Sequence, residues 1–99
     1  MEETMKDYVT ESSHKLSIAY EPDVLIAGGG IAGVAAALAA ARNGATVLLA
    51  EKQCMAGGLA TSGLVAEYLP LCDGMGHQVC FGIAEELLRL SLESGAKQP

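Results

Sequence analysis

The most constraining feature of the chain is a cluster of glycines, residues 28–30 followed by Gly33. A short aliphatic segment, residues 24–27, precedes the cluster, and an alanine-rich segment, residues 31–42, follows it. Glycine permits tight turns, whereas alanine has the strongest intrinsic helix propensity. The sequence therefore predicts a strand over 24–27, a turn, and a helix over 31–42.

A second strand is predicted over residues 46–50, a continuous apolar run of the kind found in buried parallel strands. Gly44 suits the position just after the helix, and Glu51 ends the strand. The order is strand, glycine turn, helix, strand and acid. It matches the dinucleotide-binding fingerprint in its required context and indicates an α/β, Rossmann-like βαβ unit.

Each glycine of the Gly-x-Gly-x-x-Gly pattern has a predicted role. Gly28 allows the tight exit from the strand, Gly30 leaves room for a pyrophosphate, and Gly33 lets the helix approach the sheet. The N–H groups of Ile31 and Ala32, at the start of the helix, point toward the phosphates.

Glu51 is placed to accept hydrogen bonds from the two hydroxyls of an adenosine ribose. Its negative charge also disfavours a 2′-phosphate, so NADP is not the expected ligand. The same region, from Val24 to Ala41, has an alternative interpretation as a membrane helix with a Gly29-x-x-x-Gly33 packing motif. Three consecutive glycines are poor inside any helix, so we favour the dinucleotide site.

The chain has 99 residues, which allows one small domain, and 51% hydrophobic residues, which we expect to form an aliphatic core. The formal net charge of −6, without basic clusters, argues against nucleic acid and anionic membrane surfaces as partners. The first 23 residues hold more acids than bases, unlike a signal peptide, which favours the cytoplasm.

The three cysteines, Cys54, Cys72 and Cys80, are odd in number and lack C-x-x-C spacing. They indicate neither a disulfide framework nor a zinc site. An irregular metal site of Cys72, Asp73, His77 and Cys80 is the alternative. We expect no metal, because free thiols are commonly small buried apolar groups.

Residues 1–22 are interpreted as an N-terminal extension, in which the alternating segment 16–20 predicts a short edge strand. Near the other end, residues 79–93 predict an amphipathic helix with a weak surface pair between Glu86 and Arg89. Between them, Gly57 and Gly58 begin a loop of small residues. Composition alone leaves open whether this is an ordinary surface loop or one that follows a bound nucleotide.

A family resemblance rests on two stretches. Residues 23–52, followed by Gly57-Gly58-x-x-Thr61-x-Gly63-x-Val65, resemble the N-terminal end of FAD-dependent oxidoreductases of the glutathione-reductase-like superfamily. Residues 73–87 are similar to one bacterial branch of it. The resemblance spans residues 23–90, and members of the superfamily are several times longer than this chain.

The resemblance implies FAD as the cofactor. By this resemblance, Glu51 would bind the ribose and Lys52 would lie beside the adenine, while Gly58 and Thr61 would line the path to the flavin. The residues that would hold the pyrophosphate are Gly28, Gly30, Ile31, Ala32 and Gly33. Cys54 occupies a position that is often glycine in this branch; if that position needs a positive φ, the loop bends differently here. The disulfide-reductase branch is disfavoured, because no paired cysteines follow the Gly57-Gly58 loop.

Residues 23–99 are therefore expected to be the N-terminal part of an FAD-binding domain that is incomplete as it stands. The predicted function is a segment of a flavin-dependent oxidoreductase that passes electrons from an organic substrate to FAD. A truncated, non-catalytic nucleotide-binding fragment and a segment of an NAD-dependent dehydrogenase are the alternatives. The sequence identifies neither substrate nor catalytic residues. A homo-oligomer or a further C-terminal portion would complete the sheet.

Overall fold

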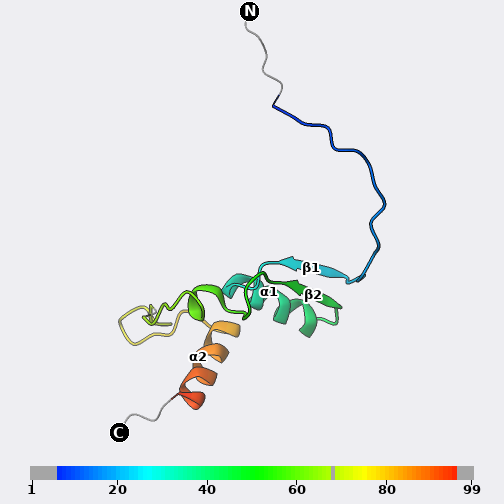
Figure 1. Ribbon diagram of the computed structural model, residues 1–99. Helices are drawn as coiled ribbons and strands as arrows, with labels where there is room; N and C mark the ends of the chain where they lie inside the picture. The colour runs from blue at the N-terminus through cyan, green and yellow to red at the C-terminus, as the bar shows by residue number, and fades with distance from the viewer. Residues whose placement is uncertain (1–6, 68, 96–99) are drawn as a thin grey trace, which may run out of the picture.

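The computed structural model describes residues 7–67 and 69–95. Strand β1 (Val24–Ala27), helix α1 (Ile31–Arg42) and strand β2 (Val47–Ala50) form a parallel βαβ unit. A short 3₁₀ helix, η1 (Gly58–Ala60), and helix α2 (Ile83–Ser94) follow (Figure 1). The α/β class and the first strand and helix agree with the sequence predictions.

Strands β1 and β2 pair in register, from Val24 opposite Val47 to Ala27 opposite Ala50. Just before the ladder, the Asp23 carboxylate accepts hydrogen bonds from the Thr46 N–H at 2.8 Å and from the Thr46 hydroxyl at 2.7 Å. These bonds lower the pKa of Asp23. Thr46 thus closes the start of the ladder, and β2 begins one residue later than predicted.

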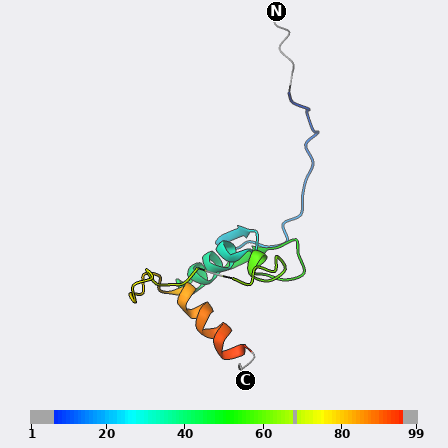
Figure 2. The same ribbon diagram turned by 90° about the vertical axis from the view of Figure 1, so that its left-hand side faces the viewer.

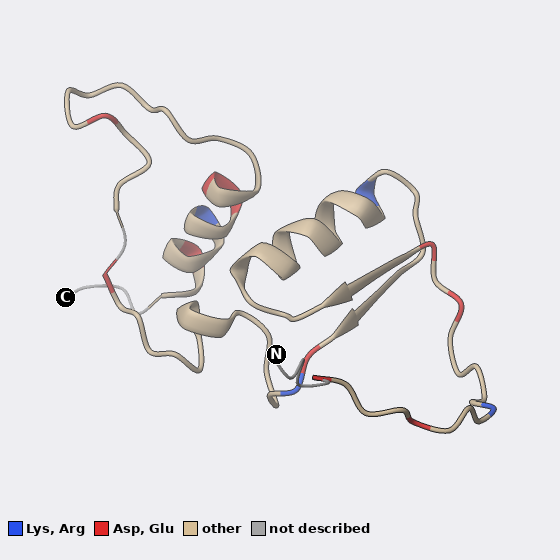
Figure 3. Cartoon of the chain, turned by 90° about the horizontal axis from the view of Figure 1, so that it is seen from above, with Lys and Arg blue, Asp and Glu red and all other residues tan. Residues whose placement is uncertain are grey.

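Helix α1 packs on one face of the two strands (Figure 3). Val24 and Ile26 of β1 are half-buried on that side, whereas Leu25 between them is 63% exposed. Among the described residues no apolar side chain is fully buried, so the expected aliphatic core is not formed. The reason is geometric: a parallel sheet is covered on both faces in complete domains, and here one layer is absent from the described residues.

The C-terminal end of α1 follows the prediction. Asn43 caps the helix, and Gly44 has a φ of 89°, which suits glycine after a helix end. Arg42 is the single charged side chain of this helix, and it lies in the last turn, where a cation interacts favourably with the helix dipole.

Residues 7–22 form no helix or strand and extend away from the βαβ unit (Figure 1, Figure 2). The predicted edge strand over 16–20 is therefore wrong. Leu16, Ile18 and Tyr20 alternate as a strand would, but their side chains are all more than 70% exposed. Alternation defines a strand only where a partner edge is within reach, and this segment runs away from the sheet.

Helix α2 begins at Ile83, not at residue 79 as predicted. The N–H groups of Val79 and Cys80 both donate to the Leu71 carbonyl, and Gly82 has a φ of 73°, so these residues cannot be helical. The predicted Glu86–Arg89 pair makes no direct ion pair; the pKa of Glu86 is lowered mainly by its hydrogen bonds from Arg42, and the charge of Arg89 adds to this effect. Glu86 instead accepts two hydrogen bonds from Arg42, whereas Arg89 lies 3.5 Å from Glu93.

In residues 7–67 and 69–95, none of the helices combines the length and the apolar content that a membrane span requires. The segment that had an alternative interpretation as a membrane helix is a strand, a turn and a helix of 12 residues.

Candidate functional site: a double glycine turn

The site is built where both strands end. Gly28 donates its N–H to the Ala50 carbonyl at 2.8 Å, which extends the sheet by one bond, and then turns with a φ of 117°. Side chains rarely adopt that φ, so glycine is required there for its backbone conformation. Gly29 follows and is buried, and Gly30 caps the start of α1.

Gly30 and Gly33 have opposite surroundings. A methyl group added at Gly33 would clash with the Gly28 carbonyl oxygen, so glycine is needed for the helix to approach the turn. A methyl group added at Gly30 would meet no atom within 4 Å. The space beside Gly30 is therefore open, as binding of a pyrophosphate against the backbone requires.

The start of α1 is free to face an anion. The first helical hydrogen bond runs from the Val34 N–H to the Gly30 carbonyl, so the N–H groups of Ile31, Ala32 and Gly33 precede it. The first turn holds no acidic residue, and no side chain caps it. Backbone donors and the positive end of the helix dipole are thus available together.

Glu51 is held by the backbone on both sides. One carboxylate oxygen accepts the Gly29 N–H at 2.6 Å, and the other accepts the Gln53 N–H at 2.9 Å. The bonds from Gln53 and then Gly29 lower the pKa of Glu51, so the side chain is ionised at neutral pH. Each oxygen has further lone pairs with which it can accept from a ligand hydroxyl.

Lys52 is exposed and lines, with Glu51, an open hollow at the carboxyl ends of the strands. Gly28 and three residues of the strands complete its lining, namely Ala27, Leu49 and Ala50. The predicted ribose and adenine residues, Glu51 and Lys52, therefore lie on the same side of the sheet edge as the first glycine.

The second loop rests on the first turn. The Gly57 N–H donates to the Gly29 carbonyl at 2.7 Å, and Gly30 and Gly57 form an isolated parallel bridge. A methyl group added at Gly58 would lie 3.0 Å from the Gly30 α-carbon. The loop whose role composition left open therefore contacts the first glycine turn.

Thr61 is arranged differently from the other predicted binding residues. Its hydroxyl donates to the Ala56 carbonyl at 2.6 Å, within its own loop. The structure brings Gly28, Gly30, Gly33, Glu51 and Gly58 together around one turn. The Thr61 hydroxyl proton, by contrast, is used to hold the loop that carries Gly58.

Sequence reasoning missed three residues of this arrangement: Gly29, Gln53 and Gly57. Gly29 is a variable position of the fingerprint, and Gln53 contributes only its backbone N–H, so neither carried a signal. Gly57 stands in a Gly-Gly pair, and that pair was the available signal.

The three cysteines are all exposed, so the expectation that they are buried apolar groups is wrong. No group of three or more His, Cys, Asp or Glu side chains suited to a metal ion occurs in residues 7–67 and 69–95. Asp73 and His77 of the alternative ligand set pair with each other at 3.1 Å. Cys54 does not have a positive φ; Leu64 is the non-glycine residue that does in that part of the chain.

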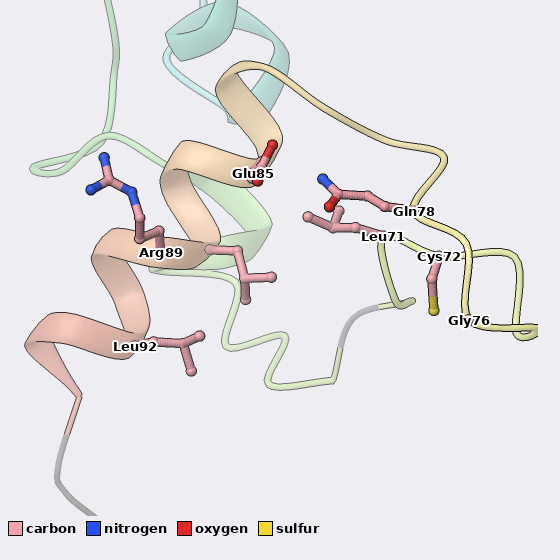
Figure 4. A pocket seen from close by; sticks show the side chains of 8 residues that line it. Leu71, Cys72, Gly76, Gln78, Glu85, Arg89 and Leu92 are labelled. Atoms are coloured by element: carbon pink, nitrogen blue, oxygen red, sulfur yellow. The ribbon is translucent and has the colours of Figure 1, made fainter.

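A second hollow lies away from the glycine turn, between α2 and the segment from Leu71 to Gln78 (Figure 4). Its wall is mostly apolar, with Leu71, Leu88 and Leu92 contributing, and Glu85, Arg89 and Gln78 lie around it. It is open to solvent, and it is separate from the residues predicted to bind the cofactor.

Comparisons with known proteins agree with this geometry. The family model described as FAD dependent oxidoreductase matches residues 23–98. The chain is also 36% identical over 70 residues to a thioredoxin reductase of Ureaplasma parvum serovar 3 (strain ATCC 700970), which covers 71% of this chain and 23% of that protein. The chain thus spans about a quarter of the length of the curated relative it matches. No solved structure matches the chain significantly.

The sequence led us to expect that the chain lies outside the disulfide-reductase branch. The matched region is 23% of the thioredoxin reductase, which is too small a part to test that expectation, so it stays a prediction. The family match covers the glycine turn, Glu51 and the second glycine loop together. The chain belongs to the FAD-dependent oxidoreductase family, whose cofactor is FAD.

Proposed function

We propose that this chain is the opening portion of a Rossmann-like FAD-binding domain, in an enzyme that passes electrons from an organic substrate to FAD. The observation that carries the proposal is the open space at Gly30. It lies beside the free N–H groups that begin α1 and on the glycine turn that Glu51 holds.

Under this proposal, Gly28, Gly30 and Gly33 shape the turn that receives the pyrophosphate. The N–H groups of Ile31 and Ala32 donate to its oxygens. These groups are neutral, so affinity depends on several of them acting together with the helix dipole.

Glu51 accepts hydrogen bonds from the adenosine ribose hydroxyls, and Lys52 lies beside the adenine. Gly58 borders the path toward the flavin. The flavin, when bound, supplies the electron chemistry, and the residues of this chain bind and orient it.

The substrate site of such an enzyme would be formed by other parts of the protein. A two-stranded sheet with one covered face is smaller than a nucleotide-binding domain, and the matched relative is about four times as long as the aligned region. Further strands beside β1 and β2 would widen the sheet, and further helices would cover its exposed face around Leu25. The cytoplasmic location stays a prediction from the sequence.

A second candidate function is a non-catalytic fragment that binds an adenine nucleotide. The absence of fully buried apolar side chains in the described residues favours it for the chain by itself. An NAD-dependent dehydrogenase segment is less well supported, because the family match names FAD.

Calorimetric titration of the chain with FAD, NAD⁺, NADP⁺ and ADP separates these functions. The proposal predicts that FAD binds most tightly and that NADP⁺ binds most weakly, because Glu51 repels the 2′-phosphate. Equal affinities for FAD and ADP would support the adenine-nucleotide fragment instead. Preference for NAD⁺ over FAD would contradict the proposal.

A further inference from the structure

The glycine turn is held at a single residue from two directions. Gly29 donates its N–H to Glu51 at 2.6 Å and accepts the Gly57 N–H at its carbonyl at 2.7 Å. Gly29 is buried, so its backbone N–H and carbonyl need these partners. The position of Gly57 therefore helps to determine the position of the turn.

Thr61 fixes Gly57 by two contacts. Its hydroxyl donates to the carbonyl of Ala56, the residue before Gly57, at 2.6 Å. Its side chain also covers the α-carbon of Gly57: a methyl group there would lie 2.5 Å from the Thr61 methyl and 2.7 Å from its hydroxyl oxygen. Gly57 has a φ of 107°, so the contact holds a backbone conformation that only glycine readily adopts.

We propose that Thr61 is a positioning residue, which acts on the cofactor site through Gly57 and Gly29 and not by contacting a phosphate. The Thr61 hydroxyl donates to the Ala56 carbonyl, which belongs to the same peptide group as the Gly57 N–H. That N–H in turn donates to Gly29 in the glycine turn. The hydroxyl has one proton, and that proton is committed to Ala56. The consequence for FAD rests on the proposed function, whereas the effect on Gly57 does not.

The test compares three variants of the full chain. Thr61→Val keeps the shape that covers Gly57 but removes the donor, and Thr61→Ser keeps the donor. Ser62→Ala is the matched control, since the Ser62 hydroxyl lies 3.4 Å from the Gly58 carbonyl, a weak contact. The first measurement is hydrogen exchange of the Gly57 amide by NMR without cofactor.

Loss of one hydrogen bond corresponds to about a tenfold change in an equilibrium. We therefore expect Thr61→Val to speed exchange of the Gly57 amide by about tenfold, and Ser62→Ala to leave it nearly unchanged. Thr61→Ser keeps the donor but loses the covering methyl, so its exchange rate should lie between these two and closer to that of the unaltered protein. Unchanged exchange in Thr61→Val would overturn the proposal. Exchange at the unfolded-chain rate in the unaltered protein would overturn it as well, because Gly57 would then not be held.

The second measurement is FAD affinity of the same proteins. The proposal expects Thr61→Val to weaken FAD binding by a factor similar to the change in Gly57 exchange, with recovery in Thr61→Ser. Weaker FAD binding with unchanged Gly57 exchange would show direct contact and would overturn the positioning role. Absence of FAD binding in every protein would contradict the proposed function, while the exchange result would still decide the role of Thr61 in the loop.

Discussion

The carboxylate of Glu51 accepts the N–H of Gly29 at 2.6 Å, although 22 residues separate them in the sequence. This bond joins the residue directly after β2 to the turn that follows β1. The Gln53 N–H holds the other oxygen at 2.9 Å. These two backbone N–H groups therefore orient the Glu51 carboxylate before any ligand arrives. The side chain then loses little conformational entropy when a ligand binds.

The first prediction concerns the charge of Glu51. Glu51→Gln keeps the size of the side chain but replaces the charged acceptor, so we expect FAD affinity to fall by about tenfold or more. Discrimination against NADP⁺ should weaken in the same variant, because the repulsion of the 2′-phosphate is lost. Calorimetric titration measures both. Glu21→Gln, in the extended N-terminal segment, is the control, and an effect of equal size there would remove Glu51 from the site.

The second prediction concerns pH. The pKa of Glu51 is lowered from its ordinary value of 4.5 by the bonds from Gln53 and Gly29. A lowered pKa in the folded state means that the carboxylate stabilises the turn above pH 4.5. That contribution is lost as the pH falls through the lowered pKa. The Gly29 amide chemical shift should therefore titrate with a midpoint below 4.5. A midpoint at or above that value would contradict the bond.

The third prediction contrasts two glycines of the fingerprint. Gly33→Ala places a methyl group against the Gly28 carbonyl oxygen, so we expect a loss of roughly 1–3 kcal/mol of stability. Gly30→Ala meets no neighbour, so the fold should be unaffected while FAD affinity falls. Denaturant unfolding and FAD titration of both variants check this. Equal destabilisation by the two changes would contradict the described turn.

The fourth prediction concerns the link between the two helices. The two terminal guanidinium nitrogens of Arg42 each donate to one carboxylate oxygen of Glu86 at 2.9 Å, and the pair is exposed. Exposed pairs contribute little to global stability, and salt screens them. The pair joins α2 to α1, so Arg42→Gln should speed amide exchange in α2. Because the pair contributes little to global stability, exchange in β1 and β2 should not change. Arg89→Gln, whose partner lies within α2, is the control. Faster exchange in the strands would show that Arg42 supports the sheet instead.

The sequence predicted the elements that glycine and alanine define. The bounds of β1 and α1 are correct because Gly28 and Gly44 mark the positions where the backbone must leave a regular conformation. The pattern also placed Glu51 at the carboxyl end of the second strand, and it lies directly after β2.

The wrong predictions depended on tertiary contacts. Alternation at 16–20 gave no information on whether an edge was in reach. The start of α2 was missed because Val79 and Cys80 bond to Leu71, a contact that helical periodicity does not reveal. The pairing of Glu86 with Arg42, 44 residues away, was equally hidden. The bond from Gly57 to Gly29 was not predictable because it joins two backbones.

The most direct test of FAD binding by the glycine turn is the visible absorption spectrum of the purified chain after incubation with FAD and desalting. The unaltered chain should retain the absorption band of oxidised flavin, and Gly30→Val should lose it because its side chain fills the pyrophosphate space. A colourless unaltered chain, or equal retention of flavin by Gly30→Val, would contradict the claim that this turn holds the cofactor.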